Sequence, residues 1–357
     1  MDGAQSPVKG ETLTFGHTIK PGAFIGLSLK NGLLNIITLT LYRFWGKTEV
    51  RRRVWSHITL NNEPFEYTGK GGELFRGFLI ALLVLGVPYL ALILAIQFVS
   101  PMFTLLMLPL YIAIIVLIGA AIFMTYRYMA SRTVWRGVRF QLQGSASKFG
   151  WSYLGYTLLV MITLGWYAPA MSMRIAEKLW GGMSYGDQKL RWERSRKEGL
   201  YGPFALAWVA GMAGYGVLIA AIMPAVMNSM QSGTEPGATL FVKIYGYALL
   251  YTLFLVVATA PYHAAVMRTI AGSIRLGDAK FGIDIKAAPL IGLTLTNVLI
   301  MLLTLGFLTP VVMARTAKFM ISRLSSAGEA PLADALQASR GPKTGEGLAD
   351  AFDVSPF

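Results

Sequence analysis

The 357-residue sequence contains no cysteine and only three histidines, at His17, His57 and His263. The lack of cysteine excludes disulfide bonds, thiolate metal ligands and cysteine nucleophiles. No two histidines stand at the spacing of a metal motif, and no paired carboxylates accompany them. We therefore expect no bound metal, no cofactor and no enzymatic activity, because no set of acid, base and nucleophile can be recognised.

Charge is scarce as well, since charged residues make up 14% of the chain and hydrophobic residues 54%. A soluble domain of this length could not bury so much apolar surface. Apolar runs of about 20 residues are long enough to cross the roughly 30 Å of hydrocarbon in a bilayer. The sequence therefore predicts a mainly α, polytopic helical membrane protein with spanning helices near residues 77–98, 101–125, 203–225 and 243–262.

Acidic residues are outnumbered, with 18 Asp and Glu against 32 Lys and Arg and a net charge of +14. Basic residues collect in cytoplasmic loops because they resist translocation across the membrane. We expect this excess to face the cytoplasm and to contact membrane lipids, chiefly anionic ones. A protein partner on the same face is the other interpretation, and we expect no nucleic acid.

One pattern occurs three times: a short strand-like stretch, an apolar segment, a Thr-Leu-Thr or Thr-Leu-Gly sequence, and then basic residues. The Thr-Leu sequences occupy residues 38–40, 163–165 and 304–306. These copies predict three internal repeats, with repeat segments near residues 21–42, 149–169 and 287–309. The first is interrupted by Lys30-Asn31-Gly32, where Asn31-Gly32 predicts a turn.

The placement of Lys and Arg discriminates between two topologies. If every repeat segment crossed the membrane, the basic residues would be shared almost equally between the two faces. If each segment instead re-enters on its own side, 28 of the 32 lie on one face. We therefore predict four spanning helices, three re-entrant or interfacial segments and two cytoplasmic termini. Seven crossings remain the alternative, because the second and third segments are long enough to cross.

The expected organisation outside the spanning segments includes small cytoplasmic β-hairpins. Apolar and polar residues alternate on both sides of Asn61-Asn62, which is typical of a hairpin. Residues 138–142 and 273–276 are further candidate strands. We expect a membrane domain over residues 13–324, flanked by an N-terminal tail (1–12) and a disordered C-terminal tail (325–357) that is poor in large apolar residues.

The stretch from Thr38 to Arg52, continued by residues 65–69 and 73–77, resembles the YjgN-like family of bacterial inner-membrane proteins. The similarity covers most of the chain, because the later Thr-Leu-Gly sequences fit it too. The resemblance implies location in the bacterial inner membrane and a multi-pass architecture. It implies no reaction, because the family is a domain of unknown function. The sequence departs from the family at Thr40, where glycine is usual.

Two sets of residues are candidate sites. Polar residues at membrane depth must be paired or line a wet cavity, so they predict a polar path between re-entrant segments. The alternative is hydrogen bonding between helices, with the lysine reaching the surface. This first set comprises Lys30, Asn31, Asn35 and Asn297. The second is a basic cluster that predicts a lipid or anion contact, or else ordinary interfacial anchors. It comprises Arg43, Lys47, Arg51, Arg52, Arg53, Trp45 and Trp55.

The leading functional hypothesis is transport or lipid handling of an amphipathic or anionic substrate. It rests on the repeated, interrupted segments and on the one-sided positive charge. The alternative is a non-catalytic scaffold or accessory subunit that binds partners through its basic cytoplasmic loops.

Overall fold

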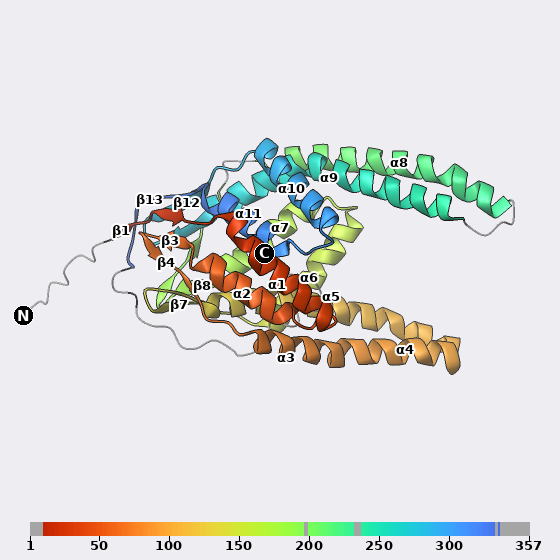
Figure 1. Ribbon diagram of the computed structural model, residues 1–357, viewed down its shortest axis with the longest axis horizontal. Helices are drawn as coiled ribbons and strands as arrows, with labels where there is room; N and C mark the ends of the chain where they lie inside the picture. Colours follow the sequence, from red (N-terminus) through yellow and green to blue (C-terminus); the bar gives the residue numbers. More distant parts are fainter. Residues whose placement is uncertain (1–9, 196–198, 232–236, 333–334, 336–357) are drawn as a thin grey trace, which may run out of the picture.

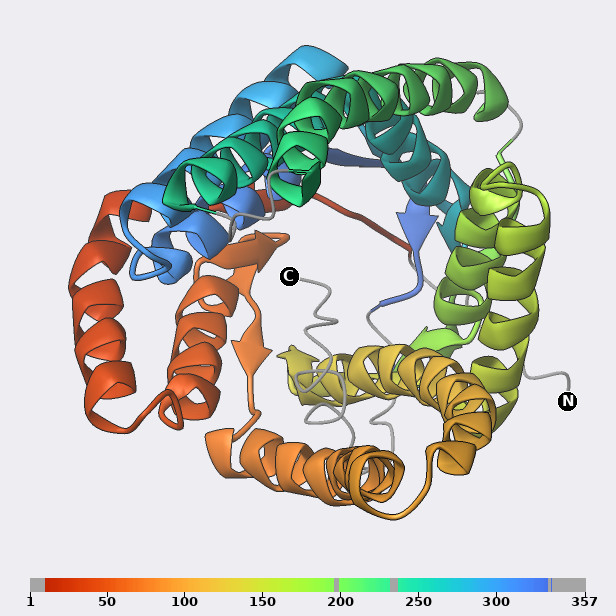
Figure 2. The same ribbon diagram turned by 90° about the vertical axis from the view of Figure 1, so that its right-hand side faces the viewer.

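The chain folds into a ring of helices that carries a layer of short strands at one end (Figures 1 and 2). This computed structural model describes residues 10–195, 199–231, 237–332 and 335. Most of the described residues are helical, so the predicted fold class is confirmed as mainly α. The ring closes because the first and last helical hairpins of the chain lie against each other.

Four helical segments of the described chain are long and apolar enough to cross a membrane, and they fall on the four predicted segments. At most 17% of the residues in each apolar stretch are buried inside the protein, as expected of helices whose solvent is lipid. They are residues 71–98 (α3 Gly71–Ala81, η2 Leu82–Gly86, α4 Val87–Phe98), residues 101–132 (η3 Pro101–Leu106, α5 Met107–Arg132), α8 Tyr201–Gln231 and α9 Ala238–Ser273.

Each Thr-Leu sequence forms the turn between two shorter helices, so the structure contains three helical hairpins with similar tips. In every tip the threonine hydroxyl donates to the carbonyl four residues earlier and accepts the amide four residues later. The hairpins are hairpin 1 (α1 Ile25–Ile37, α2 Arg43–Trp55), hairpin 2 (α6 Ala146–Ile162, α7 Ala168–Trp180) and hairpin 3 (α10 Ala287–Leu303, α11 Thr309–Ile321).

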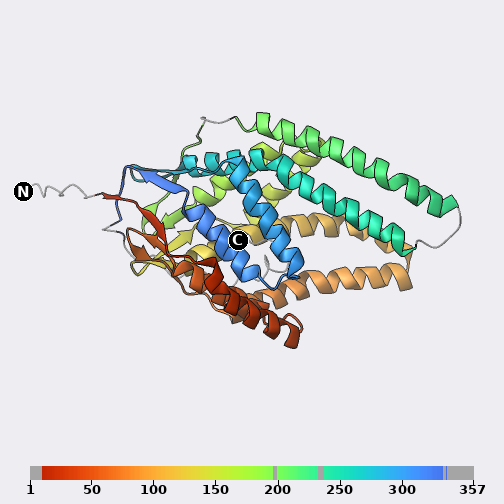
Figure 3. The same cartoon turned by 45° about the horizontal axis from the view of Figure 1, so that its top comes forward.

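The hairpin tips are apolar and exposed. Leu39, Leu164 and Leu305 all adopt a left-handed backbone conformation (φ 48°, 49° and 48°) and are 84%, 75% and 88% exposed. The next residue is also left-handed in each tip, and glycine occupies it in two of the three; Thr40 (φ 71°) is the exception. The hairpins extend from the strand layer in the same direction as the spanning helices but end sooner (Figures 1 and 3).

The turn predicted at Asn31-Gly32 was wrong, because α1 is continuous from Ile25 to Ile37. Gly32 serves packing instead. A Cβ atom at that position would lie 2.3 Å from Phe307 in the tip of hairpin 3. The missing side chain therefore lets hairpins 1 and 3 approach closely.

Short antiparallel strands from distant parts of the sequence form the layer at the other end of the molecule. The turn predicted at Asn61-Asn62 joins β3 to β4, with both asparagines left-handed. Within the described residues the layer contains four sheets, in the strand orders β1-β14, β2-β3-β4, β5-β6-β7-β8-β9 and β10-β11-β12-β13. The strands are β1 Glu11–Thr12, β2 Phe15–His17, β3 Ile58–Leu60, β4 Glu63–Pro64, β5 Glu66–Tyr67, β6 Thr133–Trp135, β7 Val138–Leu142, β8 Met183–Tyr185, β9 Gln188–Lys189, β10 Arg191–Trp192, β11 Ile274–Leu276, β12 Ala279–Ile283, β13 Leu324–Ala327 and β14 Glu329–Ala330. A 3-10 turn, η1 Pro21–Phe24, leads from β2 into α1.

The predicted tail boundaries were wrong at both ends. Residues 324–330 form β13 and β14, and β14 pairs with β1, which lies inside the predicted N-terminal tail. Both strands are held because apolar side chains near them, Leu13, Ala330 and Leu332, are buried in the main core of the strand layer. The rest of the predicted tails, residues 1–9 and most of 333–357, lies outside the described residues.

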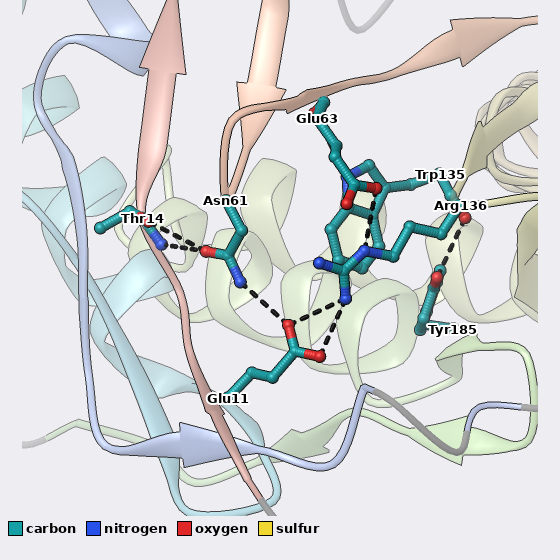
Figure 4. Close-up of polar contacts among 7 residues, drawn as sticks. All are labelled: Glu11, Thr14, Asn61, Glu63, Trp135, Arg136 and Tyr185. Atoms are coloured by element: carbon teal, nitrogen blue, oxygen red, sulfur yellow. Dashed lines mark hydrogen bonds and ion pairs between the residues drawn. The ribbon is translucent and has the colours of Figure 1, made fainter.

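The side chain of Arg136 links strands that are far apart in sequence (Figure 4). Its guanidinium donates to the carboxylates of Glu63 and Glu11 at 2.9 Å each, and the bond to Glu63 raises the pKa of Arg136. The Nδ2 atom of Asn61 also donates to Glu11, at 3.2 Å, and the Oδ1 atom of Asn61 accepts the backbone amide of Thr14 at 2.8 Å. The network joins the first strand of the chain to two β-turns of the layer.

Candidate functional site

A pocket rich in basic side chains lies between hairpin 1, the start of α3 and the end of α5. This pocket, which we call the basic groove, has a volume of about 990 Å³. Six basic and two acidic side chains line it, a net charge of +4. They are Lys30, Arg52, Lys70, Arg76, Arg132 and Arg139, with Glu49 and Glu73.

The two carboxylates of the groove are already engaged. Lys30 Nζ lies 2.6 Å from Glu49 Oε1, in a pair that is well exposed on both sides. Arg132 binds Glu73 through two bonds, Nη2 to Oε1 at 2.9 Å and Nε to Oε2 at 3.1 Å. Tyr128 donates a further bond of 2.6 Å to Glu73. The remaining basic side chains therefore give the groove an excess of positive charge.

The first turn of α3 forms one wall of the groove. Lys70 has an extended backbone at the helix N-cap, and Gly71 and Gly72 follow it. Gly71 is required because a Cβ atom there would lie 2.7 Å from the Cα atom of Trp45. The first amides of a helix lack partners within the helix and carry partial positive charge, so this wall also favours an anion.

The groove lies directly beside apolar surface. Arg76 is exposed on α3, and Leu79, Ile80 and Leu83 follow it along the same candidate spanning segment, with exposed fractions of 39%, 44% and 64%. Trp45, which is 42% exposed, forms part of the lining. Basic side chains and tryptophan next to an apolar belt are typical of the boundary between hydrocarbon and lipid head groups. The arrangement can hold a phosphate against cations while hydrocarbon follows α3.

The predicted basic cluster is divided among several faces of α2, because successive residues of an α-helix are about 100° apart. Trp45 and Arg52 line the basic groove, where the Arg52 guanidinium donates to the carbonyl of Gly69 at 3.3 Å. Arg43 and Lys47 line a different pocket, between hairpins 1 and 3.

The other members of the cluster lie elsewhere. Arg51 is fully buried and donates to the Tyr67 hydroxyl at 3.4 Å. The indole N–H of Trp55 donates to the Thr133 hydroxyl at 3.0 Å. Arg53 is exposed but does not line the groove. Arg51 and Trp55 therefore join α2 to the strand layer, and the seven residues do not form one site.

The predicted polar path is also divided. Lys30 belongs to the basic groove, whereas Asn31 and Asn35 line the pocket between hairpins 1 and 3. Asn297 is held inside hairpin 3, where its Oδ1 atom accepts from Arg315 Nε at 2.9 Å. These four residues do not line a common passage through the described structure.

Sequence reasoning missed four of the six basic residues of the groove. Lys70 and Arg76 both lie just before the start of the spanning helix predicted near residues 77–98, and this position was the only available signal. Arg132 and Arg139 reach the groove because β6 pairs with both β5 and β7. No local pattern indicates that pairing.

Comparison with known proteins gives a family match along most of the chain. The family model described as "Bacterial protein of unknown function (DUF898)" matches residues 12–351. The inner membrane protein YjgN of Salmonella typhimurium (strain LT2) is 33% identical over 153 residues, which cover 43% of this chain and 36% of that protein. The inner membrane protein YjgN of Escherichia coli (strain K12) is 26% identical over 135 residues, covering 38% and 32%. The chain thus spans about a third of the length of these relatives. No solved structure matches.

Proposed function

The chain belongs to the DUF898 family of bacterial proteins of unknown function, and we propose that it is an inner-membrane protein whose basic groove binds an anionic lipid head group. This family membership agrees with the resemblance found in its sequence. The similar YjgN proteins are named as inner membrane proteins, which supports that location. The proposal makes lipid handling, or transport of an amphipathic anion, the function of the chain.

One observation carries the proposal: a groove of net charge +4 adjoins the exposed apolar face of a candidate spanning helix. Basic pockets between transmembrane helices on the cytoplasmic side attract anionic head groups. Arginine can hold phosphate oxygens through two parallel bonds, and lysine adds a point charge. A lipid placed there would put its phosphate against Arg52, Lys70 and Arg76 and its acyl chains along α3.

The proposal includes a membrane topology in which the strand layer and both termini face the cytoplasm. The three hairpins are internal repeats that re-enter the same leaflet. Their helices have 13 or 17 residues, fewer than the roughly 20 needed to span, and their exposed leucine tips suit hydrocarbon. The pairing of β1 with β14 supports a common side for the two ends of the chain.

Single-cysteine labelling tests this topology without background, because the chain has no cysteine of its own. Ser147→Cys lies at the start of hairpin 2, in the first turn of α6, and Lys189→Cys lies after the hairpin, in β9. Ser100→Cys lies in the link between the first two spanning segments. We expect a membrane-impermeant maleimide to label Ser100→Cys in whole cells. We expect it to label the other two only in inverted vesicles. Labelling of Ser147→Cys and Lys189→Cys from opposite faces would refute the re-entrant hairpin.

Lipid retention tests the groove. The variant Arg52→Gln/Lys70→Gln/Arg76→Gln removes three charges, each worth about 1 kcal/mol toward an anionic lipid. We expect at least a roughly tenfold loss of phosphatidylglycerol retained over phosphatidylcholine in nanodiscs, measured by native mass spectrometry. The control Lys20→Gln/Arg53→Gln/Lys189→Gln removes three exposed charges outside the groove and should retain the lipid. Equal losses in the two variants would show a general surface effect and contradict the proposal.

The scaffold function is the second candidate. It is favoured by basic side chains that are exposed on the strand layer away from the groove, among them Lys189, Arg191 and Lys280. A protein that co-purifies in a fixed ratio with the wild type and with the groove variant alike would favour the scaffold. A lipid that co-purifies with the wild type but not with the groove variant would favour lipid handling.

A further inference from the structure

A second pocket, of about 420 Å³, lies between hairpins 1 and 3. We call it the hairpin pocket. It shares no lining residue with the basic groove, so nothing said about it depends on the function proposed for that groove. Its volume falls within the range of about 300–1,000 Å³ that is typical of small-molecule sites.

Two hydrogen-bond acceptors in this pocket lack donors. The Oδ1 atoms of Asn31 and Asn35 are buried and have no hydrogen-bond partner among the residues that the structure describes. The two residues are four apart on α1 and therefore lie on the same face of that helix. Asn31 is only 5% exposed, and its Nδ2 atom donates to the carbonyl of Gly46 at 3.4 Å. The Oδ1 atom is therefore the part of this side chain that is available to a ligand. Buried polar atoms are almost always satisfied, so these two oxygens indicate a ligand that donates hydrogen bonds.

The remaining lining of the pocket is basic on one side and apolar on the other. Arg43 and Lys47 contribute positive charge from α2. Hairpin 3 contributes apolar side chains, among them Met301, Phe307 and Met313. A ligand matched to this lining carries an anionic group, donors for the two amide oxygens and a hydrocarbon body.

We propose that the hairpin pocket binds a phospholipid whose head group contains both a phosphate and a primary ammonium, as in phosphatidylethanolamine. The ammonium has three N–H donors for the oxygens of Asn31 and Asn35. The phosphate is attracted to the positive charge of Arg43 and Lys47, and the hydrocarbon contacts the apolar side chains of hairpin 3. The quaternary ammonium of phosphatidylcholine has no N–H and leaves both amide oxygens unsatisfied.

The test compares lipids that differ in these donors. Purified full-length protein is placed in phosphatidylcholine nanodiscs that contain phosphatidylethanolamine or phosphatidylglycerol as the minor lipid, and native mass spectrometry counts the retained lipid. We expect the wild type to retain phosphatidylethanolamine over phosphatidylcholine. We expect Asn31→Leu/Asn35→Leu to lose that preference about tenfold, because two hydrogen bonds disappear. The control Asn228→Leu makes the same exchange at an exposed position of α8 and should keep the preference.

Several outcomes would overturn the proposal. Equal retention of phosphatidylethanolamine and phosphatidylcholine by the wild type is one of them. An unchanged preference for phosphatidylethanolamine in Asn31→Leu/Asn35→Leu is another. Equal retention of phosphatidylethanolamine and phosphatidylglycerol by the groove variant Arg52→Gln/Lys70→Gln/Arg76→Gln, which lacks the charges of the other site, would reject the ammonium as the recognised group. Asn35→Leu alone keeps the test decisive if the double variant misfolds, since that oxygen has no partner among the described residues. The groove variant Arg52→Gln/Lys70→Gln/Arg76→Gln should still retain phosphatidylethanolamine. Failure of the proposal for the hairpin pocket can therefore be distinguished from failure of the proposal for the basic groove.

Discussion

Gly150→Leu is expected to lower the stability of the protein by about 3 kcal/mol, the upper end of the cost of overpacking a core. Gly150 lies where α6 of hairpin 2 crosses α5. A Cβ atom there would lie 2.4 Å from the carbonyl oxygen of Val116 and 3.3 Å from the amide nitrogen of Ala120. These are backbone atoms of a helix, which cannot rotate away as a side chain could, so the two helices must separate.

The same exchange at Gly155 is the matched control. Gly155 lies on the same helix, but a Cβ atom there would meet no atom within 4 Å. Thermal unfolding in detergent can be monitored by size-exclusion chromatography. The midpoint temperature should be lower for Gly150→Leu and nearly unchanged for Gly155→Leu. Similar midpoints for the two variants would mean that the crossing of α5 and α6 is not as close as described.

Glu73→Ala has the second largest expected effect. The side chain of Arg132 is 10% exposed and that of Glu73 is 22% exposed, so the variant leaves a nearly buried guanidinium without its carboxylate. Removing one partner of a buried pair costs about 3–5 kcal/mol, and the partial exposure of Glu73 places the expected loss near 3 kcal/mol. Tyr128 also loses its hydrogen-bond acceptor.

Glu49→Ala is the comparison for that variant. It also removes a groove carboxylate from a basic partner, but the Lys30 and Glu49 side chains are 48% and 38% exposed. An exposed pair is worth about 0–1 kcal/mol, so the unfolding midpoint should hardly change. If both variants lose the same stability, burial of the Arg132 pair is not what stabilises this corner of the protein.

The spanning helices could be predicted because an uninterrupted apolar run needs no information from elsewhere in the chain. The turn at Asn61-Asn62 could be predicted for a similar reason, since asparagine tolerates the left-handed conformation that both residues adopt. The second arm of each hairpin was harder to recognise. The sequence of α2 contains five basic residues within 13 positions. These charges make it difficult to recognise from the sequence that one face of α2 packs against α3.

The candidate sites could be predicted only in part, because side chains that are adjacent in sequence diverge around a helix. Lys30 and Asn31 are neighbours, yet one lines the basic groove and the other the hairpin pocket. Arg139 reaches the groove from a strand more than 60 residues after Arg76, through pairing that depends on the whole strand layer. The periodicity of a helical sequence predicts on which face of the helix a side chain lies. It does not predict which other element of the protein packs against that face.

The contact between Gly32 and Phe307 has a consequence for biosynthesis. The two residues are 275 positions apart (307 minus 32), so hairpin 1 is synthesised long before the hairpin that it packs against. Until then, the surface around Gly32 is open to acyl chains or to other nascent segments. Ring closure is consequently a late, long-range step of assembly, of the kind that slows folding.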